Sequence, residues 1–163
     1  MTYIFSREVV MYHQYFETPK GFPKPYVHIT ADDKGVTSLY FVDEKTAPEV
    51  KNDITKQCVK ELRGYFAGKR TEFSVPLNPE GTEFQQRVWL QLCKIPFGEV
   101  WSYKQLSLAL GSANYCRAVG MANSRNPISL IVPCHRVIGH DGKLVGYTGG
   151  LNIKSWLLEH EKA

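Results

Sequence analysis

Residues 102–123 read SYKQLSLALGSANYCRAVGMAN, two short helical segments on either side of Gly111. Because serine is a common N-cap, we expect a first helix from Ser102 to Leu110 and a second from about Asn114 to Asn123. Two short helices joined by a glycine turn are typical of a helix-turn-helix. Many helical hairpins have this pattern and do not bind DNA. The segment is therefore either a DNA-binding helix-turn-helix or an ordinary helical hairpin.

A further helix is predicted just upstream of this motif. Thr82 and Gln85 form a capping-box pattern, and the apolar face that follows consists of Phe84, Val88 and Leu92. Before it, residues 75–81 hold two prolines and a glycine without periodicity. We therefore place a lobe boundary there, with an N-terminal structural lobe at 1–76 and a C-terminal lobe at 77–163.

The first lobe begins with β-type patterning. Residues 26–30 and 36–42 are β-rich runs around a turn at 31–35, which predicts a β-hairpin. Asp53 is expected to cap a helix that ends at Gly68 and has an apolar residue at every fourth position: Ile54, Cys58, Leu62 and Phe66. The predicted class is α/β: a small N-terminal α/β lobe with a short antiparallel sheet, then a mainly helical lobe with a helix-turn-helix.

Composition sets broad limits on the kind of protein. A chain of 163 residues with 43% hydrophobic residues can form one core or two small lobes, and its net charge of +4 mildly favours an anionic partner. Residues 1–10 lack the apolar run of a signal peptide or membrane span, so a cytoplasmic protein is expected. The four cysteines form no CxxC pair, and His13 and His28 alone make a poor site, so no metal is predicted.

The chemistry centres on residues 131–139, IVPCHRVIG, where Cys134 follows an apolar, strand-like run and His135 stands next to it. An isolated Cys-His pair is more often packing than chemistry. Taken whole, however, this string resembles the active-site signature of the O6-alkylguanine-DNA alkyltransferases, also called methylated-DNA--protein-cysteine methyltransferases. The similarity covers the second lobe, through residues 81–86, 98–100, 102–103, 117–120, 126–127, 147–150 and 156–161.

The resemblance implies transfer of an alkyl group from O6-alkylguanine in DNA to Cys134, in a single turnover that consumes the protein and needs no cofactor. Displacement at carbon suits a thiolate, yet a free thiol with a pKa of about 8.5 is only slightly ionised near neutrality. In the family the histidine after the cysteine acts through a water and is held by a glutamate, which implies His135 and Glu161.

The sequence independently allows this role for Glu161. Ile153, Leu157 and Glu161 follow at steps of four, so the carboxylate extends a predicted buried helix face. An inward carboxylate needs a partner, and His135 would supply it. The alternative is that Glu161 lies in solvent at a frayed helix end.

The other implied roles concern DNA. Arg117 is expected to fill the gap left by the extruded base, and Asn126 to tie its helix to the active-site loop. The residues implied to line the base pocket are Tyr103, Val137, Tyr147 and Thr148, and Tyr103 also assists extrusion. The partner is double-stranded DNA, bound by a monomer through the minor groove with little sequence preference and without a membrane. Candidate phosphate contacts, each of which fits solvated surface equally well, are Lys104, Arg125, Arg136 and Lys143.

Three other functions would each account for part of the sequence. Alkyltransferase-like proteins bind damaged DNA without catalysis and hold tryptophan where this chain has Cys134. A thiol hydrolase or redox enzyme would leave Arg117 and Asn126 without a role. A plain helix-turn-helix regulator would leave the Cys-His pair and Glu161 unexplained. The first lobe resembles the family only loosely, and Met121 differs from the usual end of the recognition helix.

Overall fold

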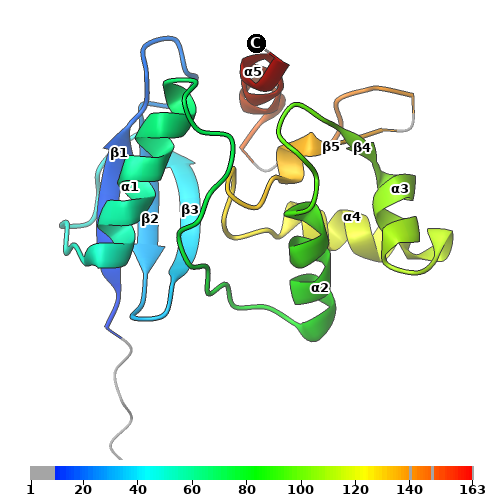
Figure 1. Ribbon diagram of the computed structural model, residues 1–163, viewed down its shortest axis with the longest axis horizontal. Coiled ribbons are helices and arrows are strands. Elements are labelled where there is room, and N and C mark those ends of the chain that lie inside the picture. The colour runs from blue at the N-terminus through cyan, green and yellow to red at the C-terminus, as the bar shows by residue number, and fades with distance from the viewer. Residues whose placement is uncertain (1–9, 140, 148, 163) are drawn as a thin grey trace, which may run out of the picture.

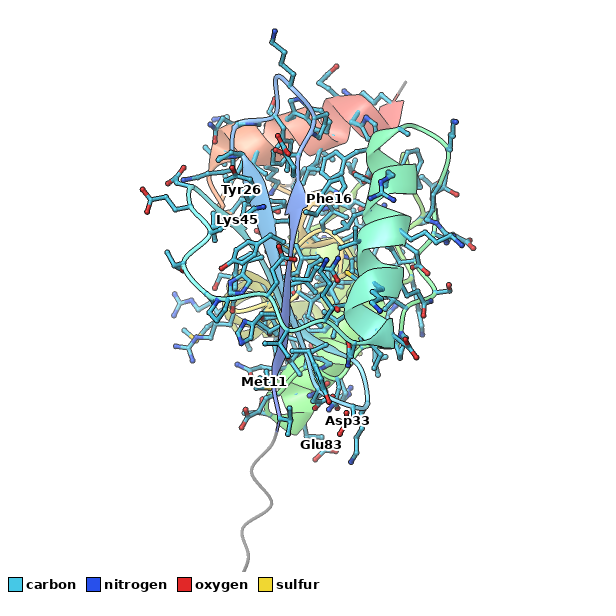
Figure 2. All side chains as sticks on the ribbon, turned by 90° about the vertical axis from the view of Figure 1, so that its left-hand side faces the viewer. Met11, Phe16, Tyr26, Asp33, Lys45 and Glu83 are labelled. Carbon is cyan, nitrogen blue, oxygen red and sulfur yellow. The ribbon has the colours of Figure 1, made fainter. Side chains whose placement is uncertain are left out.

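The computed structural model describes residues 10–139, 141–147 and 149–162. Its N-terminal part is a three-stranded antiparallel sheet with one helix packed on it (Figure 1). The elements are β1 (Tyr12–Glu17), β2 (Tyr26–Ala31), β3 (Val36–Val42) and α1 (Asp53–Phe66), with β2 in the middle of the sheet. Phe16 of β1 stacks on Phe66 of α1 with ring centroids 5.6 Å apart, which joins sheet and helix. Figure 2 shows α1 beside the sheet, with Phe16 labelled on β1.

The predicted hairpin is present, with β2 and β3 paired antiparallel. Its turn is held by Asp32, whose Oδ1 accepts hydrogen bonds from the backbone N–H groups of Lys34 at 2.8 Å and Gly35 at 3.0 Å. Strand β1 was not predicted. Three successive residues of it, Gln14, Tyr15 and Phe16, are buried, so the strand lacks the alternation of polar and apolar residues that identifies a strand in a sequence.

The helix predicted after residue 52 is confirmed, but its cap is Asn52 and not Asp53. The Asn52 side chain accepts from Thr55 N at 2.8 Å, and the Thr55 hydroxyl accepts in return from Asn52 N at 3.0 Å, a complete capping box. Asp53 is the first helical residue, where its charge favours the helix N-terminus. Cys58 is fully buried in the core, as expected.

The segment predicted as a linker is attached to the sheet at its start. Val36 N donates to Pro76 O at 2.8 Å, and Asn78 N donates to Val36 O at 2.8 Å. The approach is so close that a Cβ on Gly35 would lie 2.8 Å from the backbone of both Pro76 and Leu77. Glycine at position 35 is therefore required by contact with this segment.

The C-terminal part is mainly helical. Its elements are α2 (Glu83–Leu92), β4 (Trp101–Ser102), α3 (Tyr103–Ala109), η1 (Ala113–Tyr115), α4 (Cys116–Ser124), η2 (Cys134–Arg136), β5 (Val137–Ile138) and α5 (Leu151–Lys162). The predicted caps at Thr82 and Ser102 are both present as capping boxes. Helices α3 and α4 form the predicted helix-turn-helix around Gly111, whose φ of 117° few other residues tolerate. The two-residue parallel pair β4–β5 is too short to give a sequence pattern.

The apolar run before Cys134 was expected to be strand-like, and this expectation was wrong. Residues 129–131 form turns, and Leu130 has a φ of 73°. The loop is bonded to the edge of β3, where Leu39 N donates to Pro127 O at 2.8 Å and Ser129 N donates to Leu39 O at 3.2 Å. The run is apolar because the whole loop is buried between the two parts of the molecule, which a sequence cannot distinguish from a buried strand.

Helix α5 lies between the sheet side and the helical side of the molecule (Figure 1). Its buried face holds Ile153 and Leu157, both fully buried, and Glu161, which is 4% exposed. The predicted steps of four along one inward face are therefore confirmed. No helix in the described ranges is long and apolar enough to cross a membrane.

Candidate active site

Cys134 is the first residue of the short helix η2, and it is only 5% exposed. The side-chain amide of Asn126, directly beyond α4, donates to Cys134 Sγ at 3.2 Å and to Val132 O at 2.8 Å. Asn126 Oδ1 accepts in turn from Ile128 N at 2.9 Å. One buried amide thus holds three points of the loop and joins the helix-turn-helix to the cysteine.

His135 and Glu161 are in direct contact. His135 Nε2 lies 2.8 Å from Glu161 Oε2, and both side chains are buried. Because a carboxylate only accepts hydrogen bonds, Nε2 carries the proton, and Nδ1 of the neutral ring keeps a lone pair. Nδ1 is buried and has no hydrogen-bond partner in the described structure. This pairing excludes the alternative of a solvated Glu161.

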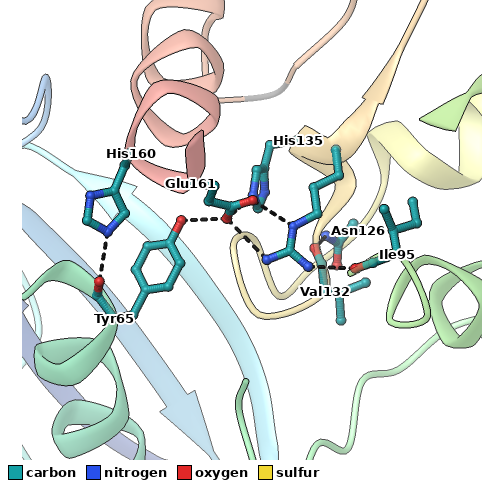
Figure 3. Close-up of polar contacts among 8 residues, drawn as sticks. Tyr65, Ile95, Asn126, Val132, His135, His160 and Glu161 are labelled. Atoms are coloured by element: carbon teal, nitrogen blue, oxygen red, sulfur yellow. Dashed lines mark hydrogen bonds and ion pairs between the residues drawn. The ribbon is translucent and has the colours of Figure 1, made fainter. Parts of the chain in front are cut away.

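The Glu161 carboxylate also accepts hydrogen bonds from two residues that were not expected there (Figure 3). Arg136 donates from Nε to Oε1 at 2.8 Å and from Nη2 to Oε2 at 3.1 Å. The Tyr65 hydroxyl donates to Oε2 at 2.7 Å. Burial opposes the charge of Glu161, but the bonds from His135 and Arg136 prevail and hold its pKa well below the usual range.

Arg136 was named as a possible phosphate contact or surface residue, and the structure contradicts both. It is 7% exposed, and besides its bonds to Glu161 its Nη1 donates to Ile95 O at 2.7 Å. A guanidinium bonded in this way supports the carboxylate from inside the protein. Lys104, Arg125 and Lys143 are exposed.

Lys154 is a second buried cation beside the cysteine. It is fully buried, and its Nζ donates to Val137 O at 2.5 Å and Val145 O at 2.9 Å. Burial raises the pKa of the Cys134 thiol, whereas the Asn126 bond and the charge of Lys154 act against this rise. Burial likewise lowers the pKa of His135, although its bond to Glu161 opposes the change. The resting pair is therefore a thiol beside a neutral imidazole.

Two predicted pocket residues lie near the sulfur. Burial raises the pKa values of the Tyr103 and Tyr147 phenols, and a negative charge on Cys134 raises both further. Val137 is fully buried in β5, next in the chain to η2. Thr148 lies outside the described residues.

Arg117 lies apart from this buried cluster. It is exposed in the first turn of α4, and Met121, one turn further along, is 58% exposed. At this spacing the two side chains share one face of the helix. The structure therefore places Arg117 on the surface of the helix-turn-helix, joined to Cys134 through α4 and Asn126.

Sequence reasoning missed three residues of the site: Tyr65, Arg136 as a ligand of Glu161, and Lys154. Tyrosine, arginine and lysine are usually amphipathic or exposed, and each is buried here only because of partners far away in the chain. The one available signal was the place of Lys154 between the buried Ile153 and Leu157.

A cavity of about 540 Å³ lies beside η2. Its lining residues include Cys93, Phe97, Pro133 and Arg136. Cys134 is not among its lining residues, so this cavity is distinct from the predicted base pocket. Within the described residues, no group of three or more histidines, cysteines or acidic residues could hold a metal ion. His13 Nδ1 and His28 Nε2 lie 3.0 Å apart in a hydrogen bond.

The similarity to known proteins extends over almost the whole chain. Residues 83–163 match the family model "6-O-methylguanine DNA methyltransferase, DNA binding domain", and residues 11–79 match "6-O-methylguanine DNA methyltransferase, ribonuclease-like domain". A methylated-DNA--protein-cysteine methyltransferase of Methanosarcina barkeri is 42% identical over 158 residues, which is 93% of this chain and 98% of the relative.

Solved structures agree with these matches. The O6-methylguanine methyltransferase of Mycobacterium tuberculosis superposes with a TM-score of 0.81 at 40% identity, covering 94% of this chain and 93% of that one. The structure of M. tuberculosis OGT in complex with DNA gives a TM-score of 0.81 at 41% identity, covering 92% of each chain.

The fold, the site and these matches define a DNA alkyltransferase with a buried cysteine beside a helix-turn-helix. The chain belongs to the family of methylated-DNA--protein-cysteine methyltransferases. The family, fold class and enzyme class predicted from the sequence are therefore confirmed.

Proposed function

We propose that this protein repairs O6-alkylguanine in DNA by moving the alkyl group to its own Cys134, once per molecule. The observation that carries the proposal is the state of His135. Its Nε2 is committed to Glu161, and its buried Nδ1 is unpartnered in the residue next to the thiol. A neutral imidazole arranged in this way is a general base for a neighbouring nucleophile.

The reaction is a displacement at the alkyl carbon. Cys134 Sγ attacks that carbon, the S–C bond forms, and the bond from carbon to guanine O6 breaks with its electron pair moving to the guanine. The thiol proton leaves through a water to His135 Nδ1 and is finally returned to the guanine. The products are an S-alkylcysteine and an unmodified guanine, so no oxidant or cofactor is required.

The surrounding groups stabilise the charges that form during this step. Glu161 stabilises the imidazolium, as the third member of a catalytic triad does. The Asn126 amide and the Lys154 ammonium stabilise the developing thiolate, against the effect of burial. These donors are fixed before the reaction, so they need little reorganisation as the charges form.

The substrate base is buried in the duplex stack, so it must first be rotated out. Arg117, exposed on α4, would enter the stack and hydrogen-bond the orphaned partner base. Tyr103 assists the rotation and bonds the ring of the extruded base, and Val137 and Tyr147 line the pocket that receives it.

DNA as the partner is supported by the match of residues 83–163 to a DNA-binding domain and by the likeness to OGT in complex with DNA. The net charge of +4 favours the same partner. We propose minor-groove binding by a monomer with little sequence preference. The C-terminal lobe at 77–163 would hold both the DNA-binding and the catalytic residues.

The turnover ends with the first transfer, because a thioether is not readily hydrolysed. The alternative of a non-catalytic DNA-damage-binding relative is disfavoured by Cys134 itself and by the base and carboxylate aligned behind it. Titration of the protein with duplexes containing O6-methylguanine tests the proposal. We expect at most one lesion repaired per protein molecule, and none with Cys134→Ala. Repair of many lesions per molecule would reject the single turnover, and undiminished repair by the alanine variant would reject Cys134 as acceptor.

A further inference from the structure

One member of the site comes from the N-terminal part. Tyr65 lies in the last turns of α1, is fully buried, and donates its hydroxyl hydrogen to Glu161 Oε2 at 2.7 Å. The two residues are 96 positions apart in the chain. This bond brings the helix that packs on the sheet into contact with the carboxylate behind His135 (Figure 3).

The Tyr65 hydroxyl shares its acceptor with His135. Oε2 of Glu161 receives the Tyr65 bond at 2.7 Å and the His135 Nε2 bond at 2.8 Å. Each donor withdraws charge from the same oxygen and makes it a weaker base. The hydroxyl of Tyr65 therefore limits how strongly Glu161 attracts the imidazole proton.

The position of Tyr65 is fixed from several sides. Its backbone carbonyl accepts a hydrogen bond from His160 Nε2 at 2.7 Å, and His160 directly precedes Glu161 on α5. Its ring lies 5.7 Å from Phe73 and 6.1 Å from Phe97, measured between centroids. Tyr65 is therefore fixed by hydrogen bonds to two successive residues of α5, His160 and Glu161.

We propose that Tyr65 is a positioning residue of the alkyl-transfer reaction and that, through Glu161, it sets the basicity of His135. The inference rests on the proposed function and assigns a chemical role to the N-terminal part, which the sequence presented as structural only. The charged and titratable groups around Glu161 and His135 are Tyr65 on α1, Cys134 and Arg136 on η2, Tyr147 in the loop after β5, and Lys154 and His160 on α5, where His160 packs against the Tyr65 ring.

Removing the hydroxyl has a predictable direction. In Tyr65→Phe, Glu161 loses a donor and attracts the imidazole proton more strongly, so His135 becomes harder to deprotonate. His135 is then protonated at a higher pH than in the native protein. The acidic limb of the profile of transfer rate against pH therefore moves to higher pH. We expect a movement of about one pH unit, which is about a tenfold change in proton affinity.

The experiment follows transfer to Cys134 from free O6-benzylguanine between pH 5 and 9, which avoids any effect on DNA binding. Tyr15→Phe is the matched control. Tyr15 is also a buried tyrosine of the N-terminal part, and its hydroxyl accepts from Thr46 N and Ala47 N, away from the site. We expect the acidic limb to move in Tyr65→Phe alone, and not to move further when Tyr65→Phe is added to Glu161→Gln.

An unmoved limb in Tyr65→Phe, with or without a uniform loss of rate, would overturn the inference and leave packing as the role of Tyr65. An equal movement in Tyr15→Phe would do the same. Titration of ¹⁵N-labelled His135 by NMR in the unreacted variants tests the same shift without any transfer. If the native protein fails to react with the free base, the proposed function is in question, whereas this titration still decides the role of Tyr65.

Discussion

The side-chain amide of Asn126 donates a hydrogen bond to the sulfur of Cys134 at 3.2 Å while also holding Val132 O at 2.8 Å. Asn126 follows α4 after a single residue, so its side chain links the end of the second helix of the helix-turn-helix to the nucleophile. A helix positioned on DNA would therefore position the thiol as well.

Asn126→Ala should destabilise the protein. It leaves Ile128 N without its buried partner and removes one of the two hydrogen bonds to Val132 O, which keeps its bond from Cys134 N. The expected cost is about 1–3 kcal/mol, the typical value for one unsatisfied buried group. Urea unfolding measures the loss, with the exposed Asn114→Ala as the control. Equal stability of the two variants would show that the amide is replaceable by water.

Lys154→Met should make Cys134 less reactive near neutral pH. The Lys154 charge lowers the pKa of the thiol, so its removal raises that pKa and moves thiolate formation to higher pH. The measurement is the rate of Cys134 carboxymethylation against pH, followed on its peptide by mass spectrometry. Lys162→Met, on the exposed side of the same helix, should leave the profile in place. A profile that moves to lower pH in Lys154→Met would contradict the assignment.

Glu161→Gln should reduce stability in a pH-dependent way. At neutral pH the loss should be about 3–5 kcal/mol, because the Arg136 guanidinium is left buried without its counter-charge. The folded pKa of Glu161 lies below its ordinary value of 4.5, so its contribution is fully present above that pH and is lost as the pH falls through the folded pKa.

The difference in unfolding free energy between native protein and Glu161→Gln should therefore narrow in acid. Glu159→Gln changes a solvent-exposed carboxylate on the same helix and should have little effect at any pH. A difference that stays constant from pH 7 to pH 3 would mean that the Glu161 charge is not the source of the stability.

Arg117→Ala should slow repair of duplex DNA by at least about tenfold, because extruding a base costs a few kcal/mol that this side chain offsets. Transfer from free O6-benzylguanine should keep its rate, since no base has to be extruded. Single-turnover rates on both substrates measure this, with the exposed Arg63→Ala on α1 as the control. Equal losses on both substrates would assign Arg117 another role.

The parts of the fold that the sequence predicted are those specified locally. The capping boxes at Thr82 and Ser102 and the steps of four on α5 depend on residues within one or two turns of each other. Strand β1 and the loop before Cys134 were missed or misassigned, because burial on several sides hides the period of the backbone.

In the candidate site, too, the residues that the sequence failed to predict are those that depend on contacts between distant segments. The pairing of Glu161 with His135 was predicted from the resemblance to the alkyltransferase family, and the structure shows it. The helical spacing and the need of a buried charge for a partner allowed this pairing but left a solvated Glu161 open. Tyr65 and Lys154 were missed because their burial depends on contacts between distant segments. Arg136 was assigned to the surface for the same reason.

Repair by this protein depends above all on the sulfur of Cys134 as the acceptor of the alkyl group. Intact and peptide mass spectrometry after reaction with a duplex containing O6-methylguanine tests this directly. We predict the gain of one methyl group, carried entirely by the peptide that contains Cys134 and absent in Cys134→Ala. A methyl group found on another residue, or gained equally by the alanine variant, would contradict the account.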